Sequence, residues 1–393
     1  MTVPLSILDL APLVAGGTAG DALRRTLDLA RHAEQFGYHR YWVAEHHLTP
    51  GVASSQPALL LGQIAAVTDH IRLGSGAVQT GFLTPLGVVE QWGLLDALYP
   101  GRFDLGLGRS AQRRKSALAA AAPEATSSQA GGAGAKPVGW AAPDETETEA
   151  RVVDGLLIPK SFSFAPILRS ARSALFFKLL HQPDASPLDL DSAIADIETL
   201  LAGPYTDGEG NEARAVPGEG ADLQIWVLGS SGGESARVAG ARGLPFAANY
   251  HVSPARVLEA VEAYRSAFRP SATLAEPKVM VSADVVVAED DETARHLATP
   301  YGLWVRSVRT GEGAVPYPSI EQAEAYEWTD EERLLVADRV ETQFVGSPDT
   351  VAERLETLRR VTGADELLVT TMTPGHADRV RSFELLAKQW YGR

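Results

Sequence analysis

The chain of 393 residues contains no cysteine. Disulfides, thiolate metal sites and a cysteine nucleophile are therefore excluded, and nothing in the sequence indicates an oxidising compartment. Basic residues are also scarce: 35 Lys and Arg stand against 50 Asp and Glu, which gives a formal net charge of −15. An acidic surface of this kind repels a phosphate backbone, so nucleic acid is not an expected partner.

Long hydrophobic runs are also missing. The first segment, MTVPLSILDLAPLVAGG, has no Lys or Arg, and Asp9 and two prolines interrupt it. It fits neither a secretory signal nor a membrane span, and we expect a first buried strand there. We therefore expect a cytoplasmic protein with no membrane partner.

The composition itself, 45% hydrophobic and 22% charged, is typical of a soluble globular protein. Short apolar runs alternate with longer amphipathic stretches, which is the rhythm of βα units around a parallel sheet. Eight strands are expected, at 5–10, 41–44, 72–77, 103–106, 224–228, 245–248, 278–287 and 366–371. Eight βα units favour a closed barrel over an open sheet. The predicted fold is α/β: a single (β/α)₈ TIM barrel over residues 1–393.

Two stretches break the rhythm. Residues 110–150 are rich in Ala, Gly and Ser and then in acid, without apolar periodicity, and we expect a mobile loop there. We interpret the whole of 110–220 as a large insertion after strand four that forms a lid. Residues 289–343 are irregular and partly helical, which predicts a smaller insertion after strand seven.

The most informative segment is RYWVAEHHLTPG, where Glu45, His46 and His47 directly follow strand two. Catalytic residues of barrels gather at this end of the strands. A purely structural alternative stays open, in which Glu45 pairs with one histidine or caps the next helix. A metal site is not expected, because adjacent histidines rarely converge on one ion.

Three further segments are candidates for binding. LGSGAV, at 73–78, places small residues where a planar ring could approach the backbone, although a tight turn explains it as well. Arg109 lies just past strand four and could hold a phosphate, or form a surface salt bridge. WVLGSSGGESARVAG places Gly and Ser at 229–233 between a strand and a helix, which makes an anion cradle or an ordinary helix cap.

These segments, together with TPLGVVEQWGLLDALYPGRFDLGLGR, resemble the luciferase-like monooxygenase family in order and spacing. The resemblance covers about 1–110 and 221–393. It implies a (β/α)₈ barrel that binds reduced flavin mononucleotide (FMN) at the carboxyl ends of its strands and uses O₂ to oxidise a small organic molecule. It gives no substrate, because residues 110–220 carry unusual sequence.

The resemblance also implies roles for individual residues. His46 matches the active-site histidine, and Glu45 would orient it. Gly76 and Ala77 match a non-proline cis peptide beneath the flavin ring. The flavin phosphate would be held by a group of residues from two loops: Arg109, Ser230 and Ser231, with Gly232 and Gly233 allowing close approach of the backbone. Gly108 stands where the light-emitting subunit has a reactive cysteine, so light emission is not implied.

The cofactor and partners follow from the same resemblance. Relatives that use the deazaflavin coenzyme tend to have Asp-His where this chain has Glu45-His46, which favours FMN. A deazaflavin-dependent dehydrogenase or reductase is the alternative, and a non-catalytic flavin-binding subunit is a third hypothesis. No second nucleotide-binding domain is visible in the sequence, so we expect a separate flavin reductase as a functional partner. A homodimer is also expected.

Overall fold

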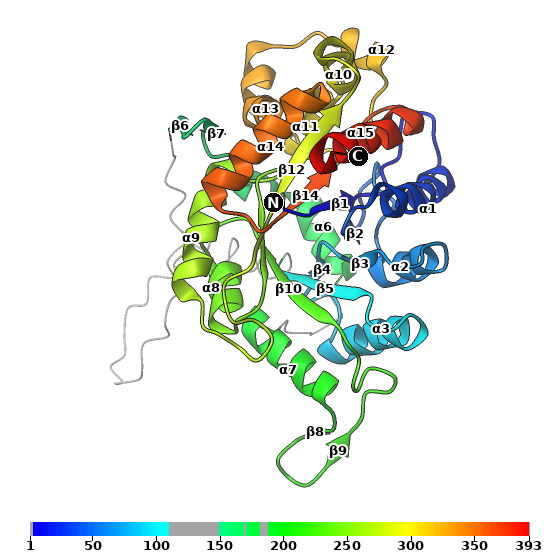
Figure 1. The fold of residues 1–393 in the computed structure, drawn as a ribbon, viewed down its shortest axis with the longest axis vertical. Coiled ribbons are helices and arrows are strands. Elements are labelled where there is room, and N and C mark those ends of the chain that lie inside the picture. The colour runs from blue at the N-terminus through cyan, green and yellow to red at the C-terminus, as the bar shows by residue number, and fades with distance from the viewer. Residues whose placement is uncertain (1–2, 110–148, 169, 181–187, 393) are drawn as a thin grey trace.

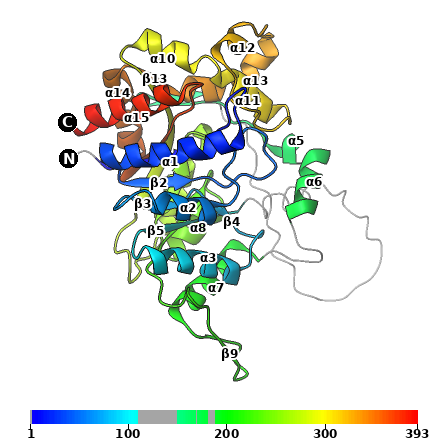
Figure 2. The same cartoon turned by 90° about the vertical axis from the view of Figure 1, so that its right-hand side faces the viewer.

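The computed structural model describes residues 3–109, 149–168, 170–180 and 188–392. Residues 110–148, where we expected most of a mobile loop, lie outside the described residues. The described part of the chain is one parallel barrel surrounded by helices (Figures 1 and 2).

Eight parallel strands form the barrel, which confirms the predicted fold class and strand positions. They are β1 (Leu5–Asp9), β2 (Arg40–Val43), β3 (Arg72–Ser75), β5 (Phe103–Gly108), β10 (Gln224–Gly229), β11 (Phe246–Asn249), β12 (Val279–Val287) and β14 (Glu366–Thr370). The ring is closed because β10 pairs with β5 as well as β11, and β1 pairs with β14 as well as β2. All carboxyl ends therefore meet at one mouth.

One helix follows each strand on the outside of the barrel. These helices are α1 (Ala19–Phe36), α2 (Pro57–Ala65), α3 (Pro85–Leu98), α7 (Leu190–Ala202), α8 (Glu234–Ala241), α9 (Val257–Ala267), α14 (Pro348–Thr362) and α15 (His376–Tyr391). Local signals set their ends. For example, Thr18 and Asp21 form a capping box at the start of α1, and Gly37 ends that helix with a left-handed backbone.

The barrel interior is filled by side chains that the strands alternately point inward. Trp42 and Trp226 come from β2 and β10, which are not neighbours in the sheet, yet their rings meet edge to face at 5.4 Å. They pack with a small apolar cluster: Leu8, Ala44, Leu228, Ala247, Met280 and Leu368. The interior is therefore a packed core and not a pore.

The region after strand four contains more than an insertion. Its described parts are β6 (Arg151–Val153), β7 (Leu156–Ile158), α5 (Ala165–Leu168), α6 (Ala171–Leu180), α7, β8 (Tyr205–Thr206) and β9 (Glu212–Ala213). We expected the whole of 110–220 to be insertion, but α7 packs against α3 and α8 and takes the place of the fourth barrel helix. Its buried face includes Ile194 and Ile197. Figure 2 shows α5 and α6 at the mouth of the barrel.

The region after strand seven is mainly helical. It contains α10 (Asp291–Ala298), α11 (Tyr301–Arg309), α12 (Ile320–Glu324), α13 (Asp330–Thr342) and β13 (Phe344–Gly346), which adds a parallel pairing to β12. Two short elements complete the described chain, β4 (Val78–Gln79) and the 3₁₀ helix η1 (Pro254–Arg256). Among the described residues, no helix is both long and apolar enough to cross a membrane.

Candidate functional site

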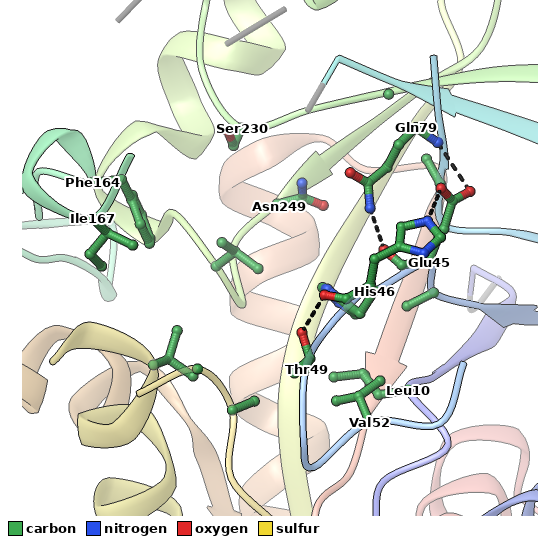
Figure 3. Close-up of a pocket in the computed structure, with 18 of the residues that line it drawn as sticks. Leu10, Glu45, His46, Thr49, Val52, Gln79, Phe164, Ile167, Ser230 and Asn249 are labelled. Atoms are coloured by element: carbon green, nitrogen blue, oxygen red, sulfur yellow. Dashed lines mark hydrogen bonds and ion pairs between the residues drawn. The ribbon is translucent and has the colours of Figure 1, made fainter. Parts of the chain in front are cut away.

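A cavity of about 550 Å³ opens at the mouth of the barrel. Its floor consists of residues at the carboxyl ends of the strands, among them Leu8, Gly76 and Leu228. Its walls come from α6, from α11 and from the loops that follow β2, β5, β10 and β11. The volume is in the range of small-molecule and cofactor sites in proteins. Figure 3 shows Phe164 and Ile167 across this cavity from Glu45 and Gln79.

His46 projects into the cavity from the loop that follows β2. Its backbone N–H donates to Ser54 O at 2.8 Å, which fixes the start of that loop. The ring is accessible from the cavity, but it lies deep in the barrel mouth among protein atoms. This burial, with repulsion from His47 as the smaller cause, lowers the pKa of His46 from 6.5 to about 4. His46 is therefore neutral at pH 7.

Glu45 does not contact His46 as expected. Its Oε1 lies 2.8 Å from Nε2 of His47 instead, and its Oε2 accepts the backbone N–H of Gln79 at 3.2 Å. The side-chain amide of Gln79 also donates to Glu45 O at 2.6 Å (Figure 3). The Glu45 carboxylate therefore holds His47 and the Gln79 backbone, and its role in orienting His46 stays a prediction. Adjacent side chains on an extended segment point to opposite faces, so Glu45 reaches the residue two places along.

The peptide bond between Gly76 and Ala77 is cis, as the resemblance implies. Both residues line the cavity floor after β3. The backbone here is tightly packed from below, since a Cβ on Gly76 would lie 2.8 Å from Leu8 Cδ1. On the neighbouring strand, a Cβ on Gly108 would lie 3.3 Å from the Ala77 side chain. The two glycines leave a flat surface on which a planar ring could lie.

Arg109 and the loop after β10 meet on one wall of the cavity. Arg109 Nη1 donates to Glu234 Oε2 at 2.5 Å, and Nε donates to Ser235 Oγ at 3.3 Å. Nη2 lies 3.6 Å from the position that a Cβ would take on Gly233. The structure thus brings Arg109 together with Ser230, Ser231 and Gly233, which all line the cavity.

This wall is rich in hydrogen-bond donors that could bind an anion. Gly233 is the N-cap of α8, and no side chain caps the helix, so its first N–H groups face the loop. The hydroxyls of Ser230 and Ser231 make no hydrogen bond to any described residue. Gly232 departs from the expectation: it is buried on the far side, where its N–H donates to Glu259 Oε1 at 3.1 Å. A Cβ there would lie 2.8 Å from the same oxygen.

The cavity also contains a histidine that sequence reasoning missed, in addition to His46 and His47. His251 follows β11, and its Nδ1 lies 2.5 Å from Ser282 Oγ on β12. Burial lowers the pKa of His251 to about 3, with Arg339 and His46 as smaller causes. Asn249, at the end of β11, points into the same space (Figure 3). The sequence could have indicated His251, because this residue follows β11 as closely as Glu45 and His46 follow β2.

The outer wall is mainly apolar. It comes from the two regions that follow β5 and β12. From the first come Phe164, Ile167, Phe176, Phe177 and Leu180, and from the second come Trp304, Val305, Val308 and Ala314. A chain of ring contacts joins this wall to the loop after β2. His47 meets Phe82 at 5.8 Å, and Phe82 meets Phe177 on α6 at 6.0 Å. Helix α6 therefore packs directly over the histidine loop.

Comparisons with known proteins agree with this geometry. The family model described as luciferase-like monooxygenase matches residues 4–127 and 189–366. The protein YvbT of Bacillus subtilis is 38% identical over 99% of this chain and 97% of its own length. A protein of Escherichia coli named luciferase-like monooxygenase is 33% identical over 98% of this chain and 96% of its own. Among solved structures, apo-MsnO8 superposes with a TM-score of 0.74 at 29% identity and covers 99% of this chain and 98% of its own.

Two more distant structures share the fold alone. The oxygenating constituent of 3,6-diketocamphane monooxygenase from Pseudomonas putida, solved with FMN, has a TM-score of 0.59 at 19% identity. It covers 99% of this chain and 97% of its own. An F420-dependent secondary alcohol dehydrogenase has a TM-score of 0.57 at 13% identity and covers 98% of each chain. One fold thus serves both flavin and deazaflavin enzymes, so it does not select between the two cofactors.

Proposed function

The chain belongs to the luciferase-like monooxygenase family, and we propose that it is a flavin-dependent monooxygenase that uses reduced FMN and O₂ to oxidise a small organic molecule. The observation that carries the proposal is the cavity at the barrel mouth. It unites a neutral histidine, a wall of hydrogen-bond donors and an apolar outer wall in one space. A small-molecule substrate is what the family itself implies.

The residues present fit a flavin phosphate. Arg109 offers a guanidinium, Ser230 and Ser231 offer hydroxyls, and the start of α8 offers backbone N–H groups on the same wall. Because Gly233 has no Cβ, a phosphate oxygen can approach both Arg109 Nη2 and the Ser231 hydroxyl. The flat surface at Gly76 and Ala77 would support the ring system. When bound, the reduced flavin would supply the electrons that activate O₂.

His46 supplies the acid–base chemistry in this proposal. A neutral imidazole can accept a proton from one group and return it to another, and its low pKa keeps it in that form. Glu45 acts as a positioning residue: it holds His47 and Gln79, and so fixes the loop from which His46 projects. The apolar wall from α5, α6 and α11 excludes water from the same space.

We also propose a separate flavin reductase as the source of reduced FMN. The described residues form one barrel with additional segments after β5 and β12. They contain no second nucleotide-binding sheet, which a domain that regenerates the cofactor would need. The homodimer and the cytoplasmic location stay predictions from the sequence.

An anaerobic titration tests the function and the cofactor together. Purified protein is titrated with reduced FMN and, separately, with reduced deazaflavin coenzyme, and O₂ is then admitted with a panel of small aldehydes, ketones and thioethers. We expect saturable binding of FMN and oxygen-dependent product formation. His46→Ala should bind FMN with unchanged affinity but lose product formation by about 10²-fold or more, the usual scale for a lost acid–base group.

The control variant is His70→Ala, which removes an imidazole that is 79% exposed. It should leave both binding and turnover unchanged. Binding of the deazaflavin coenzyme alone would overturn the monooxygenase proposal in favour of a dehydrogenase or reductase. Tight FMN binding without turnover of any compound would favour a non-catalytic subunit, and full turnover by His46→Ala would remove that residue from the mechanism.

A further inference from the structure

The charged groups around the cavity are unbalanced. Among the residues that the structure describes, four arginines line it and one carboxylate, that of Glu45. Glu45 is engaged with His47 and the Gln79 backbone, as described above. Three of the arginines have carboxylate partners: Arg109 pairs with Glu234, Arg309 with Asp338 and Arg339 with Asp284. The fourth, Arg172, has no carboxylate partner among the described residues.

Arg172 belongs to α6, the helix that covers the cavity. Its Nη2 donates to Leu48 O at 3.3 Å, and its guanidinium lies 5.0 Å from the ring centre of Phe176. Neither contact supplies a negative charge. In a protein with a net charge of −15, this places a cation without a carboxylate partner, as far as the described residues go, beside the apolar part of the cavity wall. A guanidinium in such a place is well suited to bind two oxygens of a carboxylate.

The neighbours of Arg172 define the rest of the ligand. Phe176, Phe177 and Leu180 line the same wall and offer apolar surface next to the charge. A ligand that satisfies both features has an apolar body and one anionic end. Its anionic end would lie beside Leu48, in the cavity that His46 also lines.

We propose that the substrate is a small carboxylic acid with an apolar body, and that Arg172 on α6 binds its carboxylate. This inference rests on the proposed monooxygenase function, because it names the substrate class of the same site. Since Arg172 lies on the covering helix and contacts the Leu48 loop, binding of the acid also holds α6 against the mouth. The flavin phosphate would have its own wall, formed by Arg109 and the start of α8.

The test compares a matched acid and amide as probes. Binding of 4-phenylbutyrate and of 4-phenylbutyramide is measured by isothermal titration calorimetry, with and without FMN. The wild type should bind the acid at least about tenfold more tightly, or by about 1.4 kcal/mol, because a hydrogen bond between two charged groups is stronger than one to a neutral amide. Arg172→Gln should abolish this preference and leave amide binding unchanged, whereas Arg172→Lys should retain part of it.

The matched control is Lys178→Gln, which removes one positive charge from the exposed side of the same helix. It should keep the full preference for the acid. Equal affinities of acid and amide in the wild type would overturn the proposal, as would equal losses of both probes in Arg172→Gln, which would reveal a purely structural contact. If Arg172→Gln weakened FMN but not riboflavin, Arg172 would belong to the flavin phosphate. Failure of the wild type to bind FMN would count against the proposed function alone, because the acid preference is also measured without FMN.

Discussion

His46 and His251 face the same cavity from opposite sides of the barrel, from the loops after β2 and β11. Burial disfavours the charged form of each ring, and His46 is a smaller cause of the lowered pKa of His251. The Nδ1 of His251 is engaged with Ser282, so its Nε2 is the nitrogen left to face the cavity. Two neutral imidazoles of this kind can pass protons without introducing a charge into the site.

This pair predicts an unusual titration. Proton NMR of the folded protein should give midpoints of about 4 for His46 and about 3 for His251, assigned by the resonances lost in His46→Ala and His251→Asn. In urea, both should titrate near the ordinary value of about 6.5. Because the unfolded chain then binds protons that the folded protein does not, the pair lowers folding stability as the pH falls below 6.5. A midpoint near 6.5 for either ring in the folded protein would refute its lowered pKa.

The sequence predicted those site residues that directly follow strands. Glu45, His46, Arg109 and the loop at 229–233 could be located in this way, because the carboxyl ends of parallel strands meet at one mouth. The partner of Glu45 could not be predicted, since it depends on which face of the loop each side chain takes. Arg172 could not be predicted for another reason, because only the packing of α6 over the mouth brings this residue to the cavity.

At the scale of elements, a buried charge network ties the strands at the end opposite the site. Arg40, at the start of β2, is 1% exposed and donates to Asp104 on β5, Glu366 on β14 and Gln224 on β10. Asp104 also accepts from Arg72 on β3 and from the Trp42 indole. Five of the barrel strands thus share one network, far from the cavity lining.

Removing the centre of this network should destabilise the barrel without touching the site. We expect Arg40→Met to lower the free energy of unfolding by about 3–5 kcal/mol, because it leaves buried carboxylates without their partner. The matched control is Arg24→Met on α1, whose side chain is 73% exposed and whose loss should cost about 1 kcal/mol or less. Urea unfolding measures both. FMN affinity of the folded Arg40→Met protein should be unchanged, and a loss of affinity would show that the network reaches the mouth.

Strands and barrel helices were predictable as elements because the alternation of apolar and amphipathic segments is a local property. The place of α7 was not, since its periodicity indicates a helix but not the partners on which it packs. Only its contact with α3 and α8 makes it the fourth barrel helix. Strands β4 and β13 were missed because two and three residues are too short to show a period.

At the scale of the whole molecule, the barrel and its covering helix differ in how firmly they are held. Helix α6 has no buried residue, whereas α7, of similar length, buries five. Among the described residues, α6 contacts the mouth at Leu48 through Arg172 and at Phe82 through Phe177. Segments with little buried apolar surface open at low free energy, and elements that move on ligand binding are drawn from them.

Hydrogen exchange should therefore separate the two helices. Followed by mass spectrometry, amides of 171–180 should exchange much faster than those of 190–202 in the free protein, because α6 lacks the apolar anchor that α7 has in Ile194 and Ile197. Adding 4-phenylbutyrate should slow exchange in 171–180 and leave 190–202 unchanged, and Arg172→Gln should remove this protection while Lys178→Gln keeps it. Equal exchange in the two helices of the free protein would mean that α6 is held as firmly as α7. The carboxylate would then bind to a preformed site, without a change in the position of α6.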